Sequence, residues 1–290
     1  MNQFAQVHSA LFSLTLLWGL TFPLIKEAVS VIPPSIFIVL RLAIASLIFL
    51  PFILAYRKKM SFTMIKWTVV LGFFESATYV FQSIGLETVS SANSEFLTDF
   101  SVVVVSFLTL VFLRKKLQWF DFAAALLCLV GIFIQIDADV FTLTSGDFWT
   151  LACAFFYSCY IVALQAFSKK IKAKDTTLAL SYKIAFSLFL SLLTFSYENM
   201  GVIFSWFVVI PVLFFLIFVT CLVFYLQFWY QRYVSMRKAV LIYAFEPIFS
   251  RIFGYLLNSE KIYLNNIRGL LILITFLLSG LASFKKLQLV

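Results

Sequence analysis

The chain has 290 residues, of which 63% are hydrophobic and only 12% are charged, and its mean hydropathy is +1.03. Soluble domains carry about 25% charged residues, so most of the outer surface of this chain must face lipid. The net charge of +9 therefore indicates basic loops beside a membrane. We expect the lipid bilayer as a partner and no nucleic acid.

Ten apolar stretches are long enough to cross a bilayer, which requires about 20 residues per helix. Very short connections join them, so no soluble domain is inserted. The sequence predicts an all-α membrane protein with ten transmembrane helices at residues 6–26, 34–56, 64–86, 91–113, 118–136, 147–168, 176–197, 205–230, 236–257 and 267–284.

The connections alternate in charge, and this alternation predicts the orientation. One set contains sixteen basic residues and the alternate set contains three. Loops rich in Lys and Arg stay in the cytoplasm, so both termini are expected there, in the plasma membrane (the inner membrane of a bacterium). The basic set is Arg57, Lys58, Lys59, Lys66, Arg114, Lys115, Lys116, Lys169, Lys170, Lys172, Lys174, Arg232, Arg237, Lys238, Lys285 and Lys286.

Two halves of five spans each are expected, because similar residues recur 145 positions apart. Gln82 matches Gln227 at this offset, and Phe100 matches Phe245. With an odd number of spans per half, the second copy inserts upside down. We therefore predict inverted five-helix repeats at residues 1–138 and 146–285, a plan typical of transporters with a site near the membrane midplane.

Each half contains its own short motifs. The first half contains Trp18-Gly19 with Pro23, then Arg41-Leu42-Ala43 and Ser90-Ser91-Ala92-Asn93, and the second contains Glu246-Pro247-Ile248-Phe249, Gly254 and Glu260. With these motifs in this order, the chain resembles the EamA-type carriers of the drug/metabolite transporter superfamily. The resemblance implies ten helices, cytoplasmic termini and alternating-access transport of a small organic solute, usually export.

The first half departs from this family pattern at two places. Val102 stands where proline is common, so we expect the first half to lack the helix break of the second. Arg114-Lys115-Lys116 replaces a usual Gly-Glu pair.

Charged and aromatic residues within the spans are the candidate site. Lipid offers polar groups no partner, so such residues should face the protein interior. The predicted substrate-binding residues are Trp18, Arg41, Glu75, Tyr79, Gln82, Asn93, Asp99, Tyr157, Tyr160, Lys183, Tyr243 and Glu246.

Structural roles are alternatives for several of these residues. Arg41 and Asp99 are equally well interpreted as an ion pair with each other. Lys183 and Arg251 lie within about seven residues of span ends, so each could extend its charge to the interface, and Arg251 could instead pair with Glu95. The aromatic residues could simply pack helices together.

The favoured function is secondary active transport of small organic metabolites, such as amino acids or their derivatives, with the mixed charges suited to a zwitterion. A low-dielectric cavity favours protonated carboxylic acids, so coupling to protons through Glu246 and Glu75 is one expected cycle, and solute exchange is another. The alternative is a multidrug exporter for aromatic cations.

Other functions lack the residues they require. The only histidine is His8, and the four cysteines form no Cys-x-x-Cys pair, so neither a metal site nor a cofactor is expected. An enzyme acting on lipid would need a His, Cys or Asp cluster at the interface, so we predict no enzymatic activity. The sequence also lacks the Gly-rich phosphate-binding loop of ATP-driven transport.

Overall fold

A computed structural model of the chain describes residues 3–56, 59–113, 126, 130, 144–194, 206–234, 239, 242–243 and 245–260. These residues form helices and short connections, with no strand among them. Within the described ranges, six helices are long and apolar enough to cross a membrane. The predicted spans 118–136 and 267–284 lie outside the described residues, apart from two isolated positions.

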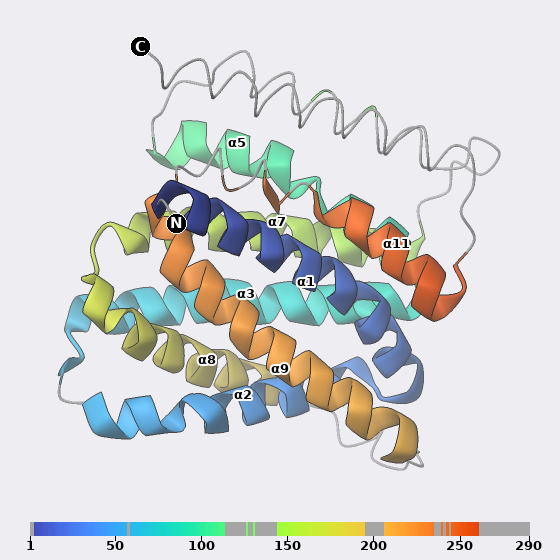
Figure 1. The fold of residues 1–290 in the computed structure, drawn as a ribbon, viewed down its shortest axis with the longest axis horizontal. Helices are drawn as coiled ribbons and strands as arrows, with labels where there is room; N and C mark the ends of the chain where they lie inside the picture. Colours follow the sequence, from blue (N-terminus) through green and yellow to red (C-terminus); the bar gives the residue numbers. More distant parts are fainter. Residues whose placement is uncertain are drawn as a thin grey trace.

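The first three helices run in alternating directions. α1 (Gln3–Val31), α2 (Pro34–Tyr56) and α3 (Phe62–Thr88) follow one another with short connections. Figure 1 shows α1, α2 and α3 running back and forth along the long axis of the molecule, with the N-terminus at one end of the bundle. Ser61 begins α3 by accepting a hydrogen bond from Met64 N at 3.2 Å, which satisfies one of the unpaired amides of a helix start.

The fourth predicted span is a broken helix. α4 (Ser91–Thr98) ends at Asp99, and α5 (Ser101–Leu113) continues after a turn. Phe100 N bonds to Leu97 O at 3.1 Å, and Val103 N bonds to Phe100 O at 3.0 Å, so the backbone tightens to i→i−3 spacing. The expectation that the first half lacks a break was therefore wrong. Thr98 Oγ1 bonds to Ser94 O at 2.8 Å, and this type of side-chain bond bends helices without proline.

Long helices also follow one another in the second half of the chain. α7 (Ser145–Ser168) begins with a capping box between Thr144 and Asp147, which pairs two backbone donors of the helix start. A short 3₁₀ turn, η2 (Ala173–Asp175), leads into α8 (Thr176–Leu193). α9 (Trp206–Tyr230) ends in the 3₁₀ turn η4 (Gln231–Tyr233).

α11 (Glu246–Asn258) begins inside the ninth predicted span, again after a turn. Phe245 N bonds to Ile242 O at 3.2 Å, and Ile248 N bonds to Phe245 O at 3.2 Å. Pro247 lies in the first turn of α11, where its fixed φ suits a helix and its missing N–H costs no intrahelical bond. The helix therefore restarts at Glu246.

Helices of the first half pack mainly on helices of the second. α1 contacts α9 and α11, α2 contacts α8, and α3 contacts α7 and α8. Gly19 permits the close approach of α1 and α11, because a Cβ there would lie 2.5 Å from Phe249 Cβ. Gly85 does the same for α3 and α7, since its Cβ would lie 2.5 Å from Thr150 Oγ1.

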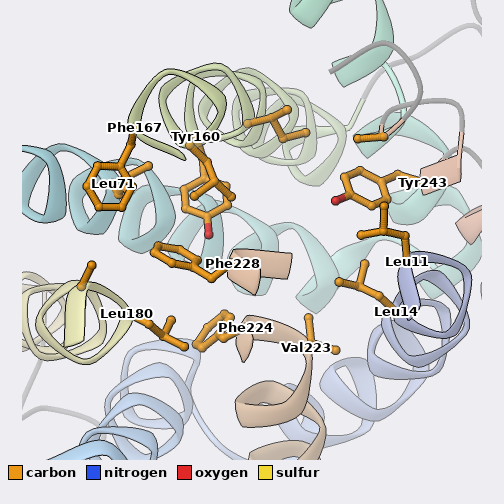
Figure 2. Packing of buried hydrophobic residues seen from close by; sticks show 14 of the residues in the cluster. Leu11, Leu14, Leu71, Tyr160, Phe167, Leu180, Val223, Phe224, Phe228 and Tyr243 are labelled. Carbon is orange, nitrogen blue, oxygen red and sulfur yellow. The ribbon is translucent and has the colours of Figure 1, made fainter. Parts of the chain in front are cut away.

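The largest apolar core lies between these helices and is rich in aromatic rings. Figure 2 shows Tyr160 of α7 reaching toward Phe224 and Phe228 of α9, while Tyr243 approaches Leu11 of α1. In contrast, large apolar side chains on the outer helix faces are exposed: Leu47 is 65% exposed and Phe107 61% exposed. These outward side chains form the surface expected to contact acyl chains.

Candidate functional site

A polar cavity lies inside the bundle, between helices of both halves. Its volume is about 50 Å³. A single water requires roughly 10–15 Å³ by this measure, so the cavity has room for a few waters. The lining residues are Trp18, Thr21, Phe22, Arg41, Glu75, Thr78, Tyr79, Gln82, Thr98, Cys153, Tyr157, Tyr160, Gln227 and Glu246.

Most of the predicted substrate-binding residues reach this cavity. Eight line it: Trp18, Arg41, Glu75, Tyr79, Gln82, Tyr157, Tyr160 and Glu246. The remaining four, Asn93, Asp99, Lys183 and Tyr243, do not. Of these, Lys183 bonds a lining residue and Tyr243 packs against one, whereas the exposed Asn93 lies at one end of α4.

Glu75 and Lys183 form a buried ion pair between α3 and α8. Glu75 Oε2 also accepts a hydrogen bond from Ser187 Oγ at 3.0 Å. Aromatic rings cover the Lys183 ammonium, with Phe224 at 3.8 Å and Phe228 at 5.0 Å. Lys183 is 0% exposed, so the expectation that it extends to the interface was wrong.

Arg41 contacts the cavity wall and does not pair with Asp99. Its Nε donates to Thr220 Oγ1 at 2.7 Å, and its guanidinium carbon lies 4.4 Å from the ring centre of Tyr79. The expected ion pair with Asp99 is therefore replaced by contacts to α9 and α3. Arg41 also lines the cavity, so its positive charge lies where a solute could reach it.

Glu246 contributes a carboxylate to the cavity wall. It is 8% exposed and begins α11. Within the described part of the chain, no hydrogen bond to its side chain is formed. Glu95 and Asp99 of the broken fourth span lie close enough to interact with it electrostatically. Two helix breaks thus place acidic side chains together.

An aromatic cluster beside Glu246 joins α1, α7 and the segment before α11. The Trp18 ring packs edge-on against Tyr157 at 5.8 Å and against Tyr243 at 5.1 Å between ring centres. The Tyr157 hydroxyl is buried without a hydrogen-bond partner among the described residues. Buried hydroxyls in native proteins are normally paired with protein or water, so this group is available to a bound molecule.

Some cavity residues were not predicted as site residues. Gln227 lines the cavity with Gln82, and the 145-residue offset that links these two glutamines was the available signal. Thr220 follows Glu75 by the same 145 positions, and its hydroxyl accepts a hydrogen bond from Arg41. Cys153 is completely buried at the wall, and no pattern in the sequence distinguished it from the other cysteines.

Arg251 differs from both roles expected for it. It is 5% exposed, so it does not extend to the interface. Its Nη2 lies 3.5 Å from Asn93 Oδ1, and Glu260 is within electrostatic range. Arg251 therefore belongs to a polar cluster with Asn93 and Glu260, and among the described residues it forms no ion pair with Glu95.

Apolar helices around a cavity with charged and aromatic walls are typical of a multi-pass membrane transport protein. More specifically, the chain belongs to the EamA-like transporter family, whose model matches residues 7–136 and 144–279. The resemblance to drug/metabolite transporter carriers is thereby confirmed.

Individual relatives agree with this family. The chain is 27% identical over 246 residues to an uncharacterized transporter of Archaeoglobus fulgidus, covering 84% of this chain and 76% of the relative. It is 22% identical over 279 residues to the uncharacterized transporter YoaV of Bacillus subtilis, covering 92% and 94%. A solved crystal structure that is 17% identical shares the fold with a TM-score of 0.69 over 98% of this chain and 99% of that one.

Proposed function

We propose that this protein is a secondary active transporter of small organic solutes, working by alternating access through the cavity that Glu246 and Glu75 line. The observation that carries the proposal is the cavity itself, where charged and aromatic side chains of both halves meet inside an apolar bundle. Such groups are costly within a membrane unless they face a partner or a hydrated space. A transported solute explains why they gather there.

The two halves are proposed to be inverted repeats, within residues 1–138 and 146–285. The backbone supports this arrangement, because the bonds at Phe100 recur 145 positions later at Phe245, with the same i→i−3 spacing on both sides. Discontinuous helices at corresponding positions of two halves are typical of inverted-repeat transporters.

The polar contacts across the halves follow the same relationship. Lys183 of α8 bonds Glu75 of α3, and Arg41 of α2 bonds Thr220 of α9. Glu75 and Thr220 are 145 positions apart, so they occupy corresponding positions of the two halves. In each case, a basic residue of the other half contacts that position. We propose that both termini lie in the cytoplasm of a plasma membrane, as the distribution of basic loops predicts.

An amino acid or a derivative is the proposed solute. Arg41 and Glu246 both line the cavity, so a carboxylate and an ammonium group of one molecule would each find an opposite charge. Lys183 and Glu75 neutralise one another, which leaves Arg41 and Glu246 as the charges available for recognition. The cavity has room for only a few waters in this conformation, so binding and passage of such a solute both require the halves to move apart.

An exporter of aromatic cations is the second candidate. The edge-on rings around Trp18 and the three neighbouring carboxylates, Glu95, Asp99 and Glu246, favour it, because cations bind both aromatic faces and acidic groups. The two candidates differ in their need for Arg41, which a zwitterion requires and a cation does not.

Purified protein in proteoliposomes tests the transport function. A panel of radiolabelled amino acids and aromatic cations is supplied outside, with unlabelled solute inside. Saturable uptake that rises through counterflow is expected for one class. An absence of counterflow for every solute class, with the protein folded in the vesicles, would contradict the proposal.

Proton coupling through Glu246 is tested in the same vesicles. Glu246→Gln keeps the shape of the side chain but removes its ability to release a proton. Uptake driven by a pH gradient should be lost, while solute exchange at equal pH should continue with a higher KM, because the amide no longer attracts the ammonium group of the solute. Full gradient-driven transport by the variant would exclude coupling through this residue and leave exchange as the cycle.

A further inference from the structure

A basic hollow lies at the end of the bundle where α2 ends and α3 begins. Its volume is about 450 Å³, and it opens between the α2–α3 connection and the α7–α8 connection. Four lysines, Lys59, Lys170, Lys172 and Lys174, and one acid, Asp175, contribute to the wall. This lysine hollow is separate from the central cavity, and none of its residues lines that cavity.

The lysine hollow has an excess of positive charge that the described chain does not neutralise. Its four ammonium groups face one carboxylate, and the ion pair found among the described residues is that of Lys183 and Glu75. Ring contacts position two of the lysines. Lys170 Nζ lies 4.9 Å from the ring centre of Trp67, and Lys59 Nζ lies 4.6 Å from that of Tyr56.

The start of α3 adds to this positive field. Ser61 and Met64 belong to the wall of the hollow, and they bracket the first turn of a helix of 27 residues. Amide groups in a first turn carry partial positive charge and attract anions. Three of the lysines come from the second half of the chain, whereas Lys59 and this turn come from the first, so an anion between them would join the two connections.

Apolar residues complete the site and distinguish it from an ordinary basic loop. Phe167 and Ile171 contribute to the wall of the hollow. Just beyond Ser61, Phe62 is 82% exposed and Ile65 is 46% exposed on α3. Basic loops that only set orientation need neither a hollow nor an apolar margin. A site with ammonium groups beside outward apolar side chains matches the headgroup and acyl chains of a phospholipid.

We propose that the lysine hollow binds the phosphate of an anionic phospholipid, whose acyl chains lie along the exposed start of α3. Phosphate oxygens would accept hydrogen bonds from Lys170, Lys172 and Lys174, and Lys59 would approach from the first half. The bound lipid would then connect the start of α3 with the end of α7. This inference goes beyond solute transport and does not depend on which solute is carried.

The test measures lipid binding to the purified full chain by native mass spectrometry in detergent. Phosphatidylglycerol should bind with a discrete stoichiometry and raise the melting temperature, whereas phosphatidylcholine at the same concentration should do neither. Each lysine near an anionic headgroup contributes roughly a fivefold factor in affinity. Lys170→Gln combined with Lys172→Gln should therefore weaken phosphatidylglycerol binding about 25-fold.

Lys66→Gln combined with Lys169→Gln is the matched control. Both residues are exposed at the same end of the bundle, neither lines the hollow, and the charge removed is the same. This control should change binding less than about threefold. Equal losses in both double variants would show general attraction to basic loops and would overturn the proposal.

A final experiment with inorganic phosphate distinguishes a lipid headgroup from a soluble phosphate compound. If phosphate alone, without lipid, raises the melting temperature in the same lysine-dependent manner, the ligand is a soluble phosphate compound and the lipid assignment is wrong. Unchanged lipid binding in the Lys170 and Lys172 double variant would also overturn it.

Discussion

Arg41 is the residue at which the two candidate solute classes make opposite demands. Arg41→Gln removes the positive charge that would bind a carboxylate. For a zwitterionic solute, KM should rise at least about tenfold, because one charge-assisted hydrogen bond is worth roughly 1.5–3 kcal/mol. For an aromatic cation, uptake should be unchanged or improved.

Thr220→Val is the control for this experiment. It removes the hydrogen bond that positions Arg41 but retains the guanidinium. A smaller increase in KM than that of Arg41→Gln is expected in proteoliposome uptake. Amino acid transport by Arg41→Gln with an unchanged KM would contradict the zwitterion assignment.

The Glu75–Lys183 pair is predicted to stabilise the fold because each buried charge neutralises the other. Lys183→Met leaves the buried Glu75 carboxylate without its counter-charge, and breaking a buried pair in this way costs about 3–5 kcal/mol. Thermal unfolding in detergent should show a large loss of stability. Adding Glu75→Leu to Lys183→Met should recover most of it, whereas equal losses in the single and double variants would contradict a mutual compensation.

The broken helices were only partly predictable from sequence. At Glu246, proline in the following position indicated a restart, and the structure places Pro247 in the first turn. At Asp99 no proline is present, and the break depends on Thr98 bonding back to Ser94 O and on tightened bonds around Phe100. Such bonds depend on tertiary packing, which residue spacing does not reveal.

The loop after α11 is predicted to hold one end of the bundle closed. Glu260 Oε1 accepts hydrogen bonds from Ser91 N at 2.8 Å and Ser91 Oγ at 2.7 Å, so a carboxylate of the second half caps the start of α4. Nearby, Lys26 Nζ donates to Val89 O at 2.6 Å and Leu86 O at 3.1 Å, at the end of α3.

Glu260→Ala should therefore favour the opening of this end. A single cysteine replacing Gln82, in a background without native cysteines, should react faster with an impermeant thiol reagent added from that side. The exposed Glu27 lies at the same end, and Glu27→Ala is the matched control with no expected effect. An unchanged rate in Glu260→Ala would show that the contact does not limit opening.

At the scale of the whole molecule, the sequence predicts the class of fold and that charged residues within the spans face the protein interior. Glu75, Tyr79 and Gln82 share one helix face and do line the cavity. Residue spacing along one helix does not predict which residue of another helix a side chain will contact. Lys183 and Glu75 are 108 positions apart, and whether such charges pair depends on how the halves meet.

The central claim is that the cavity between the halves opens alternately to the two sides of the membrane. Gln82 lines this cavity, and Leu47 is 65% exposed on the outer face of α2. Each is replaced separately by cysteine in a chain without native cysteines, and an impermeant thiol reagent is added from one side of sealed vesicles at a time. The account predicts that the cysteine at position 82 reacts with reagent added from either side and that saturating solute protects it. The cysteine at position 47 should react from neither side. Reaction at position 82 from one side only, under every solute condition, would contradict alternating access.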